Sequence, residues 1–305
     1  MATVLITGGT GFIGSHLSRF LREKGYHVII LSRKPGTASK DGIEYRHWNI
    51  ESGEIDAGAI GSADHIIHLA GAGMADQRWT KSRKKEIIDS RAKSGELLAD
   101  ALQRIPNHVS TVVSTSAIGW YGPDTTETRV NGFTEDAPAS TEFPAVTCKA
   151  WEQSVQPVTR LGKRLVIVRV GIVLSPDGGA LKAFSKPLRF GIAPIFSKGD
   201  QVVSWISMED LCRIFLYALE HPEIKGVYNG VAPQPVSNKE LILQLAAKLR
   251  GKFFIPVHIP SFMLRLMLGE LSVEVLKSAT VSSNKIRQAG FTFIHPGIKA
   301  ALDLK

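Results

Sequence analysis

The chain has 305 residues, of which 44% are hydrophobic and 21% are charged. This composition is typical of a globular protein, and it excludes a disordered, collagen-like or low-complexity chain. Lys and Arg outnumber Asp and Glu by 37 to 28, a formal net charge of +9, but no nucleic-acid-binding motif accompanies this excess, so we expect no nucleic-acid partner.

The first 170 residues alternate short apolar runs with helical patterns, which is typical of βαβ units and a parallel sheet. The predicted strands cover residues 4–6, 28–31, 66–69, 109–114 and 165–170. The predicted helices cover residues 11–24, 83–104 and 146–161. The pattern therefore predicts an α/β fold: a doubly wound parallel Rossmann sheet of five or six strands with helices on both faces.

The rhythm changes after about residue 170, where glycine and proline become more frequent. Helices are predicted at 208–220 and 238–250 without strong strand patterns between them. We predict a Rossmann domain over residues 1–170 and a smaller C-terminal substrate-binding lobe over 171–305, some segments of which return to the first domain. The amphipathic run 262–268 would suit a membrane or partner contact, but such short stripes are more often core, and we place it there.

A glycine-rich loop, Thr7-Gly8-Gly9-Thr10-Gly11-Phe12-Ile13-Gly14, follows the first predicted strand and opens a helix. Glycine has no Cβ, so the backbone can turn tightly and approach a pyrophosphate. The helix N-terminus supplies free N–H groups and partial positive charge. This context favours a dinucleotide site over a plain tight turn. The residues expected to contact the cofactor are Gly8, Thr10, Gly11, Phe12, Ile13 and Gly14.

The residues after the second predicted strand indicate which dinucleotide binds. NAD sites carry an Asp or Glu there, which accepts a hydrogen bond from the ribose 2′-hydroxyl. This chain has Ser32-Arg33-Lys34 and no carboxylate before Asp41. A guanidinium grips a 2′-phosphate and a hydroxyl adds a donor. We therefore predict NADP(H), with Arg33 as the main anchor and Ser32 as the second; the alternative is a basic surface loop.

Motifs over nearly the whole chain carry a family resemblance. They are Thr7 to Gly14, Leu69-Ala70-Gly71, Trp79, Ser90-Arg91, Ser116-Ala117 through Tyr121-Gly122, Lys149 with Trp151-Glu152, Arg169 to Ser175, Ser204-Trp205-Ile206, Asn229 to Pro233, and Gly290-Phe291. With these motifs the chain resembles the extended short-chain dehydrogenase/reductase family of nucleotide-sugar epimerases. More narrowly, it is similar to an atypical NADP-binding, epimerase-like branch, sometimes labelled cell-division-inhibitor-like.

The resemblance implies a catalytic hydroxyl after a central strand and a Tyr-x-x-x-Lys helix. Ser116 matches the hydroxyl, and Lys149 matches the lysine that binds the nicotinamide ribose. The tyrosine is missing, because Ala145 stands four residues before Lys149 and no other tyrosine in the chain has a lysine four residues later. General acid–base help, worth about 10²–10⁴-fold, must then come from another group. Tyr121 is the preferred candidate.

Cys148 and a water held by Lys149 are the alternative proton donors. The resemblance also places the stretch Leu69-Ala70-Gly71 against the adenosine half of the cofactor. Ser116 is followed by Ala117 and Ile118 instead of the Asp-Glu pair of sugar dehydratases, which disfavours dehydration. Epimerisation is disfavoured as well, because it relies on the tyrosine base.

Other chemistries lack their motifs. His65 and His68 form an H-x-x-H, but an odd separation in a strand points them to opposite faces, so we expect no metal. The chain contains no G-x-S-x-G elbow and no P-loop. We therefore expect an NADP(H)-dependent oxidoreductase acting on a small carbonyl or sugar-like substrate. The alternative is an NADPH-binding or sensing protein with a degenerate catalytic site, and a third reading is polyanion binding.

The cysteines and the chain start bear on location. Cys148 and Cys212 allow at most one disulfide bridge, which favours a reducing compartment. No apolar stretch approaches the roughly 18 residues that cross a bilayer. The first residues lack the basic segment of a signal peptide. We expect a soluble, cytoplasmic protein, a monomer or homodimer, with no membrane partner.

Overall fold

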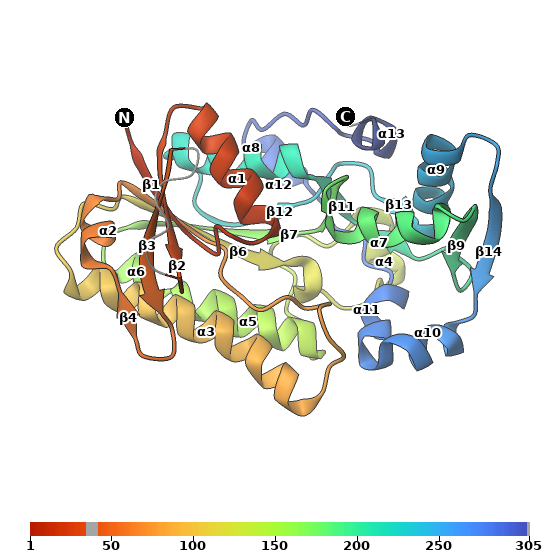
Figure 1. Cartoon of the computed structure of the whole chain (residues 1–305), viewed down its shortest axis with the longest axis horizontal. Helices are drawn as coiled ribbons and strands as arrows, with labels where there is room; N and C mark the ends of the chain where they lie inside the picture. Colours follow the sequence, from red (N-terminus) through yellow and green to blue (C-terminus); the bar gives the residue numbers. More distant parts are fainter. Residues whose placement is uncertain (35–41, 304–305) are drawn as a thin grey trace.

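The computed structural model describes residues 1–34 and 42–303, so Asp41 lies outside the described residues. Its centre is an eight-stranded sheet in the order β12-β7-β6-β5-β1-β2-β3-β4 (Figure 1). Neighbouring strands are parallel except β4, which runs antiparallel to β3. The strands are β1 (Thr3–Thr7), β2 (His27–Ser32), β3 (Ile43–Asn49), β4 (Glu54–Ile55), β5 (His65–His68), β6 (Thr111–Ala117), β7 (Arg164–Val170) and β12 (Gly226–Gly230).

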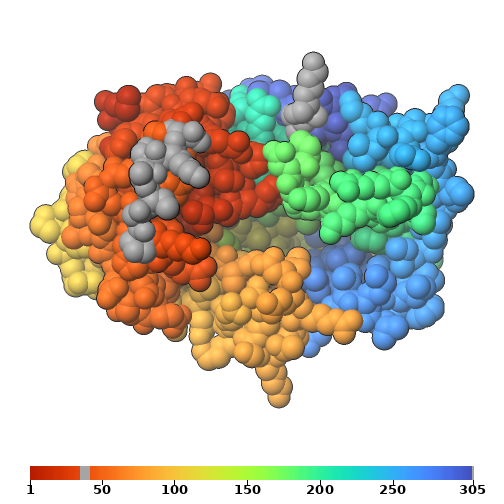
Figure 2. All heavy atoms as spheres, in the orientation of Figure 1, coloured from red at the N-terminus to blue at the C-terminus, as the bar shows by residue number. Residues whose placement is uncertain are grey.

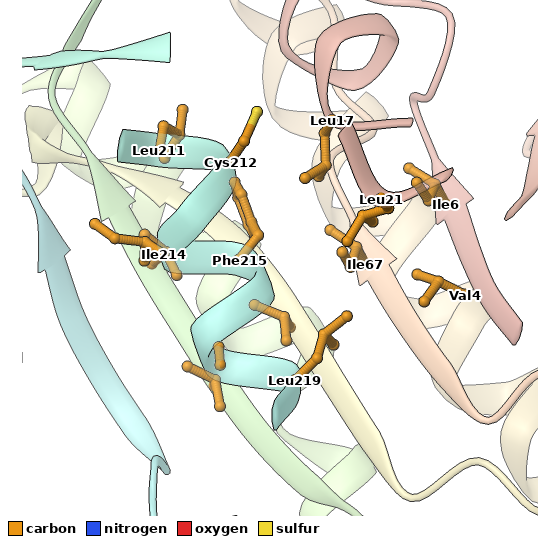
Figure 3. Close-up of a cluster of buried hydrophobic side chains, with 14 of the residues drawn as sticks. Val4, Ile6, Leu17, Leu21, Ile67, Leu211, Cys212, Ile214, Phe215 and Leu219 are labelled. Atoms are coloured by element: carbon orange, nitrogen blue, oxygen red, sulfur yellow. The ribbon is translucent and has the colours of Figure 1, made fainter. Parts of the chain in front are cut away.

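Helices cover both faces of this sheet. One face packs against α1 (Phe12–Glu23) and α8 (Met208–Glu220). In Figure 3, Leu17 and Leu21 of α1 lie beside Val4 and Ile6 of β1, and Phe215 of α8 points toward them. The opposite face packs against α2 (Ala57–Ser62), α3 (Lys81–Arg104), α5 (Phe143–Val155) and α6 (Pro157–Arg160). The predicted α/β Rossmann fold is confirmed.

The sheet reverses its strand order between β1 and β5, since β2 and β3 extend it on one side and β5, β6 and β7 on the other. Ligands of open α/β sheets bind at such a switch point, beyond the carboxyl ends of the strands. The residues predicted to bind the cofactor follow β1, β2 and β5 at this edge. Ser116 lies near the carboxyl end of β6.

Three strands of the sheet were not predicted: the short antiparallel β4 and the parallel strands β3 and β12. The run Ile43–Asn49 mixes apolar and charged residues, so its pattern is weak, yet it forms β3 beside β2. The run Gly226–Gly230 is short and bounded by glycines, yet it forms β12 and pairs with β7. The sheet therefore has seven parallel strands, and the chain between α8 and α9 returns to it. The division into two domains stays a prediction.

The rest of the chain forms a smaller lobe around its own apolar core. Three two-stranded sheets belong to it: β8 (Ile172–Ser175) with β11 (Trp205–Ser207), β9 (Ile192–Phe196) with β14 (Ile255–Ile259), and β10 (Val202–Val203) with β13 (Val236–Ser237). Its main helices are α7 (Gly179–Leu188), α9 (Asn238–Arg250) and α10 (Ser261–Leu268). The remaining short elements are η1 (Ile118–Trp120), α4 (Thr126–Asn131), η2 (Gly269–Leu271), α11 (Ser272–Leu276), α12 (Asn284–Gln288) and α13 (Ile298–Leu302).

The prediction that the run 262–268 is core is wrong for most of its length. It forms α10, in which only Leu264 is buried. The side chains of Phe262 and Leu266 are 68% and 76% exposed. The stripe has the spacing of a buried helix face, but a spacing cannot show whether another element packs against it. Over residues 1–34 and 42–303, no helix has the length and apolar character that a bilayer crossing requires.

Candidate functional site

The loop between β1 and α1 is built on glycines that leave no room for side chains. Gly8 has φ +69°, and a Cβ there would lie 2.9 Å from the carbonyl carbon of Leu69. A Cβ on Gly14 would lie 2.2 Å from the carbonyl oxygen of Gly8. Gly11 is more open, since its Cβ would meet only that oxygen, at 3.3 Å. Gly8 and Gly14 thus shape the loop, while the surface at Gly11 stays bare.

A series of buried hydrogen bonds beneath this loop connects β1 to the end of β5. The Thr7 hydroxyl oxygen accepts hydrogen bonds from the amides of Leu69 and Ala70 at 3.2 and 3.3 Å. Its proton therefore goes to Nδ1 of His68, at 2.8 Å. Nε2 of His68 then donates to Ser94 Oγ at 3.4 Å. Burial lowers the pKa of His68 to about 4, which keeps the imidazole neutral.

The stretch after β5 packs closely on α3. A Cβ on Gly71 would lie 3.0 Å from the guanidinium carbon of Arg91. That guanidinium donates to the carbonyl of Ala72 at 2.9 Å and lies over the ring of Trp151. Burial lowers the pKa of Arg91 to about 10. The stretch Leu69-Ala70-Gly71, which is predicted to contact the cofactor, lies beside Gly8 of the glycine loop. Arg91 holds the backbone that follows it in place.

The residues predicted to select the cofactor end β2. Ser32 is the last residue of the strand, and its hydroxyl accepts a hydrogen bond from the Lys34 amide at 3.3 Å. Arg33 follows the strand directly and is exposed. Because β1 and β2 are adjacent and parallel, Arg33 and the glycine loop leave the sheet at the same edge. This arrangement suits an anion held between the loop and a guanidinium.

Ser116 is buried, and within the described residues its hydroxyl makes no hydrogen bond. A buried hydroxyl without a partner costs about 1–3 kcal/mol, so the Ser116 hydroxyl remains available to bond a bound molecule. Cys148 lies beside it on α5 and donates to the Ala117 carbonyl at 3.5 Å. Burial raises the pKa of the Cys148 thiol to about 11, which makes it a weak proton donor.

The helix that the resemblance associates with catalysis is α5. Ala145, at the position of the missing tyrosine, is fully buried, whereas Lys149 is exposed one turn later. Residues four apart lie on the same side of a helix. Ala145 therefore packs in the interior, and Lys149 is the charged group at the exposed end of this side of α5.

Tyr121 does not lie where a proton donor is expected. Its ring is fully buried and stacks on Phe133. Its hydroxyl donates to Asn229 Oδ1 at 2.7 Å and accepts from Arg169 Nη1 at 3.1 Å. Burial raises the pKa of Tyr121 to about 12. Because the phenol O–H already donates to Asn229 within the core, Tyr121 does not fit the role of proton donor.

Arg169 is the centre of a buried network that the sequence reasoning missed. It forms an ion pair with Glu152 of α5, donates to the Glu135 carbonyl at 3.0 Å, and lies 3.7 Å over the ring of Trp120. Asn229 of β12 joins it through Tyr121. Arg169, Glu152 and Asn229 all belong to the motifs that carry the family resemblance. Their shared membership of those motifs is the signal that could have indicated that they interact.

A second charged cluster lies beside the backbone carbonyl of Tyr121. Lys277 donates to the Tyr121 carbonyl at 3.2 Å and forms an ion pair with Glu274 at 2.6 Å. Burial raises the pKa of Glu274. Glu142, which precedes α5, lies 3.8 Å from the same ammonium. The C-terminal lobe thus contacts the loop after Ser116 through Lys277. In the described residues no group of three His, Cys, Asp or Glu could hold a metal ion.

Comparison with known proteins places this geometry among relatives. A model of the "NAD dependent epimerase/dehydratase family" matches residues 4–229, and a "Domain of unknown function (DUF1731)" matches residues 259–303. An epimerase family protein of Mycobacterium leprae is 34% identical over 303 residues, which cover 99% of this chain and 94% of the relative.

Two solved structures are similar. The human epimerase family protein SDR39U1, solved with NADPH, has a TM-score of 0.85 and 30% identity, and the match covers 98% of this chain and 97% of that one. MoeE5, solved with UDP-glucuronic acid and NAD, has a TM-score of 0.79 and 21% identity, and covers 99% of this chain and 96% of that one. At 21% identity this second likeness concerns the fold alone.

Proposed function

Because this chain belongs to the NAD dependent epimerase/dehydratase family, which confirms the predicted resemblance, we propose that it is an NADP(H)-dependent oxidoreductase acting on a small carbonyl or sugar-like substrate. The observation that carries the proposal is the loop from Gly8 to Gly14, with Arg33 leaving the sheet at the same edge. The bound nicotinamide would supply or accept a hydride.

The residues present fit this cofactor. The amides at the start of α1 would hold the pyrophosphate, because the bare surface at Gly11 lets it approach. Arg33 and Ser32 would hold the 2′-phosphate. The NADPH found with the human relative supports this choice, although the more distant MoeE5 was solved with NAD. The preference for NADP(H) therefore rests on Arg33 of this chain.

Two residues would act at the reacting end of the cofactor. The Ser116 hydroxyl, which lacks a partner in the described residues, would donate to a substrate oxygen. Lys149 would bind the nicotinamide ribose from the exposed side of α5. Tyr121 would be a positioning residue, because its hydroxyl is held between Asn229 and Arg169. The proton would then pass through a water held by Lys149.

A second candidate function follows from Ala145. This buried alanine stands at the position of the tyrosine that is the usual acid of the parent family, and it has no proton to donate. A chain that keeps the cofactor loop without that acid would bind or sense NADPH without turning over a substrate.

We also place the protein in the cytoplasm, a reducing compartment, because Cys148 and Cys212 are both buried free thiols.

Titration of NADPH and NADH, followed by nicotinamide fluorescence, tests the cofactor proposal. The chain should bind NADPH more tightly than NADH. Arg33→Glu should weaken NADPH binding by roughly tenfold or more, because it replaces a charge-assisted bond by repulsion. Lys24→Glu, an equal charge change at the end of α1, is the control and should leave the affinity unchanged. Tighter binding of NADH by the natural chain would overturn the proposal.

Turnover separates the two candidate functions. NADPH oxidation should be measured over a panel of aldehydes, ketones and keto-sugars. The oxidoreductase proposal expects turnover that Ser116→Ala and Lys149→Ala reduce by roughly 10²-fold or more, without a loss of folding. Tight NADPH binding without turnover on the whole panel favours the binding or sensing function.

A further inference from the structure

The positive charge of this chain is concentrated in two stretches. Between Asp177 and Asp200, and between Glu240 and Glu270, there is no Asp or Glu. These stretches hold eight of the chain's basic residues, against a net charge of +9 for the whole protein. The eight are Lys182, Lys186, Arg189, Lys198, Lys248, Arg250, Lys252 and Arg265, and all are exposed. Among the described residues only Lys248 of this set forms an ion pair, with Asp303.

The two stretches meet at one end of the molecule. The first contains α7 and β9, and the second contains β14 and α10. β9 and β14 pair in parallel, and the Ile255 amide donates to the Gly191 carbonyl at 2.8 Å. Figure 1 shows β9, β14, α9 and α10 at the end of the molecule opposite β1–β4. Figure 2 shows the same stretches, green and light blue, over that end.

Large apolar side chains are exposed among these charges. Phe190 and Phe253 are 84% and 82% exposed, and each directly follows a basic residue, Arg189 or Lys252. Their turns are adjacent, because Phe253 is two residues before Ile255, the partner of Gly191. We call the following exposed residues, taken from the two turns and from β9, α9, β14 and α10, the lobe-tip surface: Arg189, Phe190, Ile192, Arg250, Lys252, Phe253, Ile255, Phe262, Arg265, Leu266 and Met267.

This combination does not suit pairing with a second copy of the chain. A two-fold interface places a patch against itself, so the unpaired cations of the lobe-tip surface would face one another. Strand addition at β14 is also disfavoured. The Ile255 amide points to β9, so the backbone nitrogen of Pro256 points away from it and has no hydrogen to donate. An anionic partner, by contrast, matches both the charge and the exposed apolar groups.

We propose that the lobe-tip surface docks on the surface of an anionic lipid bilayer. Aromatic and aliphatic side chains enter the boundary between headgroups and acyl chains, while Lys and Arg contact the lipid phosphates. Each Lys or Arg near such a surface adds to the attraction, so several together give measurable binding. The expectation of no membrane partner rested on the lack of a spanning segment, which a surface contact does not require.

Sedimentation with vesicles tests the proposal on the full chain. The protein should bind vesicles of phosphatidylglycerol and phosphatidylcholine in equal parts, and binding should fall as salt rises. It should bind vesicles of phosphatidylcholine alone far more weakly. Arg189→Glu with Lys252→Glu should weaken binding by roughly tenfold or more. Phe190→Ser with Phe253→Ser should also weaken it, because burial of the aromatic rings is lost.

The control variant carries the same charge change elsewhere: Lys24→Glu with Arg160→Glu, two exposed residues at the end of α1 and in α6. It should bind the mixed vesicles like the natural chain. All of these positions are exposed, so circular dichroism should show unchanged folding. Failure to bind the mixed vesicles at low salt overturns the proposal, as does an equal loss in the control. Light scattering that shows a dimer in the absence of lipid, dissociated by the Phe→Ser pair, would assign the surface to a second copy instead.

Discussion

Arg169 and Glu152 meet in the interior through two parallel hydrogen bonds. Nε of the guanidinium donates to Oε1 at 2.8 Å, and Nη2 donates to Oε2 at 3.0 Å. Both side chains are almost fully buried. The pair joins β7 of the central sheet to α5, the helix that carries Lys149. The ion pair therefore helps to fix α5 on the central sheet.

Removal of one partner of this pair should be strongly destabilising. Glu152→Gln leaves the Arg169 charge buried and unpaired, and the free energy of unfolding should fall by about 3–5 kcal/mol. Urea denaturation measures the change. Asp89→Asn, which breaks the exposed Lys85–Asp89 ion pair on α3, is the control and should change stability by less than about 1 kcal/mol. Similar effects of the two variants would contradict the prediction.

Stability should fall in mild acid because of His68. Burial lowers its pKa from 6.5 to about 4 in the folded chain. In the unfolded chain the imidazole takes up a proton at higher pH than in the folded chain. The contribution of His68 to the free energy of unfolding is therefore fully present above pH 6.5 and is lost as the pH falls toward 4. Linkage gives a loss of about 3 kcal/mol from this group at most. Urea denaturation at several pH values, with His68→Gln for comparison, should show a shallower slope in the variant.

The glycines of the loop after β1 should respond differently to alanine. Gly14→Ala should lower the melting temperature, because its Cβ would lie 2.2 Å from the Gly8 carbonyl oxygen. Gly11→Ala meets that oxygen at 3.3 Å and should affect stability less. It should nevertheless weaken NADPH binding, since the methyl group would stand where the proposed cofactor's pyrophosphate would approach. Thermal unfolding and NADPH titration of both variants distinguish the two effects. Equal melting temperatures would contradict the assignment.

Tyr121→Phe tests the positioning role of the phenol. The variant leaves Asn229 Oδ1 without its donor and removes an acceptor from Arg169. We expect the free energy of unfolding to fall by about 1–3 kcal/mol. If NADPH-dependent turnover is found, it should survive in the folded variant to within about tenfold, in contrast to the effect of Ser116→Ala. A stable variant that loses all turnover would restore Tyr121 as the proton donor.

The local patterns of this chain predict much of its fold. The helices at 208–220 and 238–250 have the predicted bounds, because each combines a Ser N-cap with an amphipathic pattern. β3 and β12 escaped prediction because an edge or glycine-bounded strand is stabilised by its neighbour in the sheet. The exposure of Phe262 and Leu266 also depends on what packs over α10, which no local pattern reports.

The cofactor loop was predictable for a different reason. Its glycines are required by contacts only a few residues away, such as that of Gly14 with Gly8. The network around Arg169 joins residues from distant parts of the chain, Trp120, Glu135, Glu152 and Asn229. Only the folded topology brings them together. That network, and not the motif, shows that the Tyr121 hydroxyl is already engaged.

At the start of α7, Gly178 and Gly179 of the smaller lobe lie against the ring of Phe12, which begins α1. A Cβ on either glycine would lie 2.7 or 3.0 Å from ring carbons. The smaller lobe and the start of α1 therefore meet in one close contact, with bare backbone on one side and an aromatic ring on the other. A methyl group on either glycine would push the lobe off this ring, so the seating of the lobe on the Rossmann sheet depends on two missing side chains.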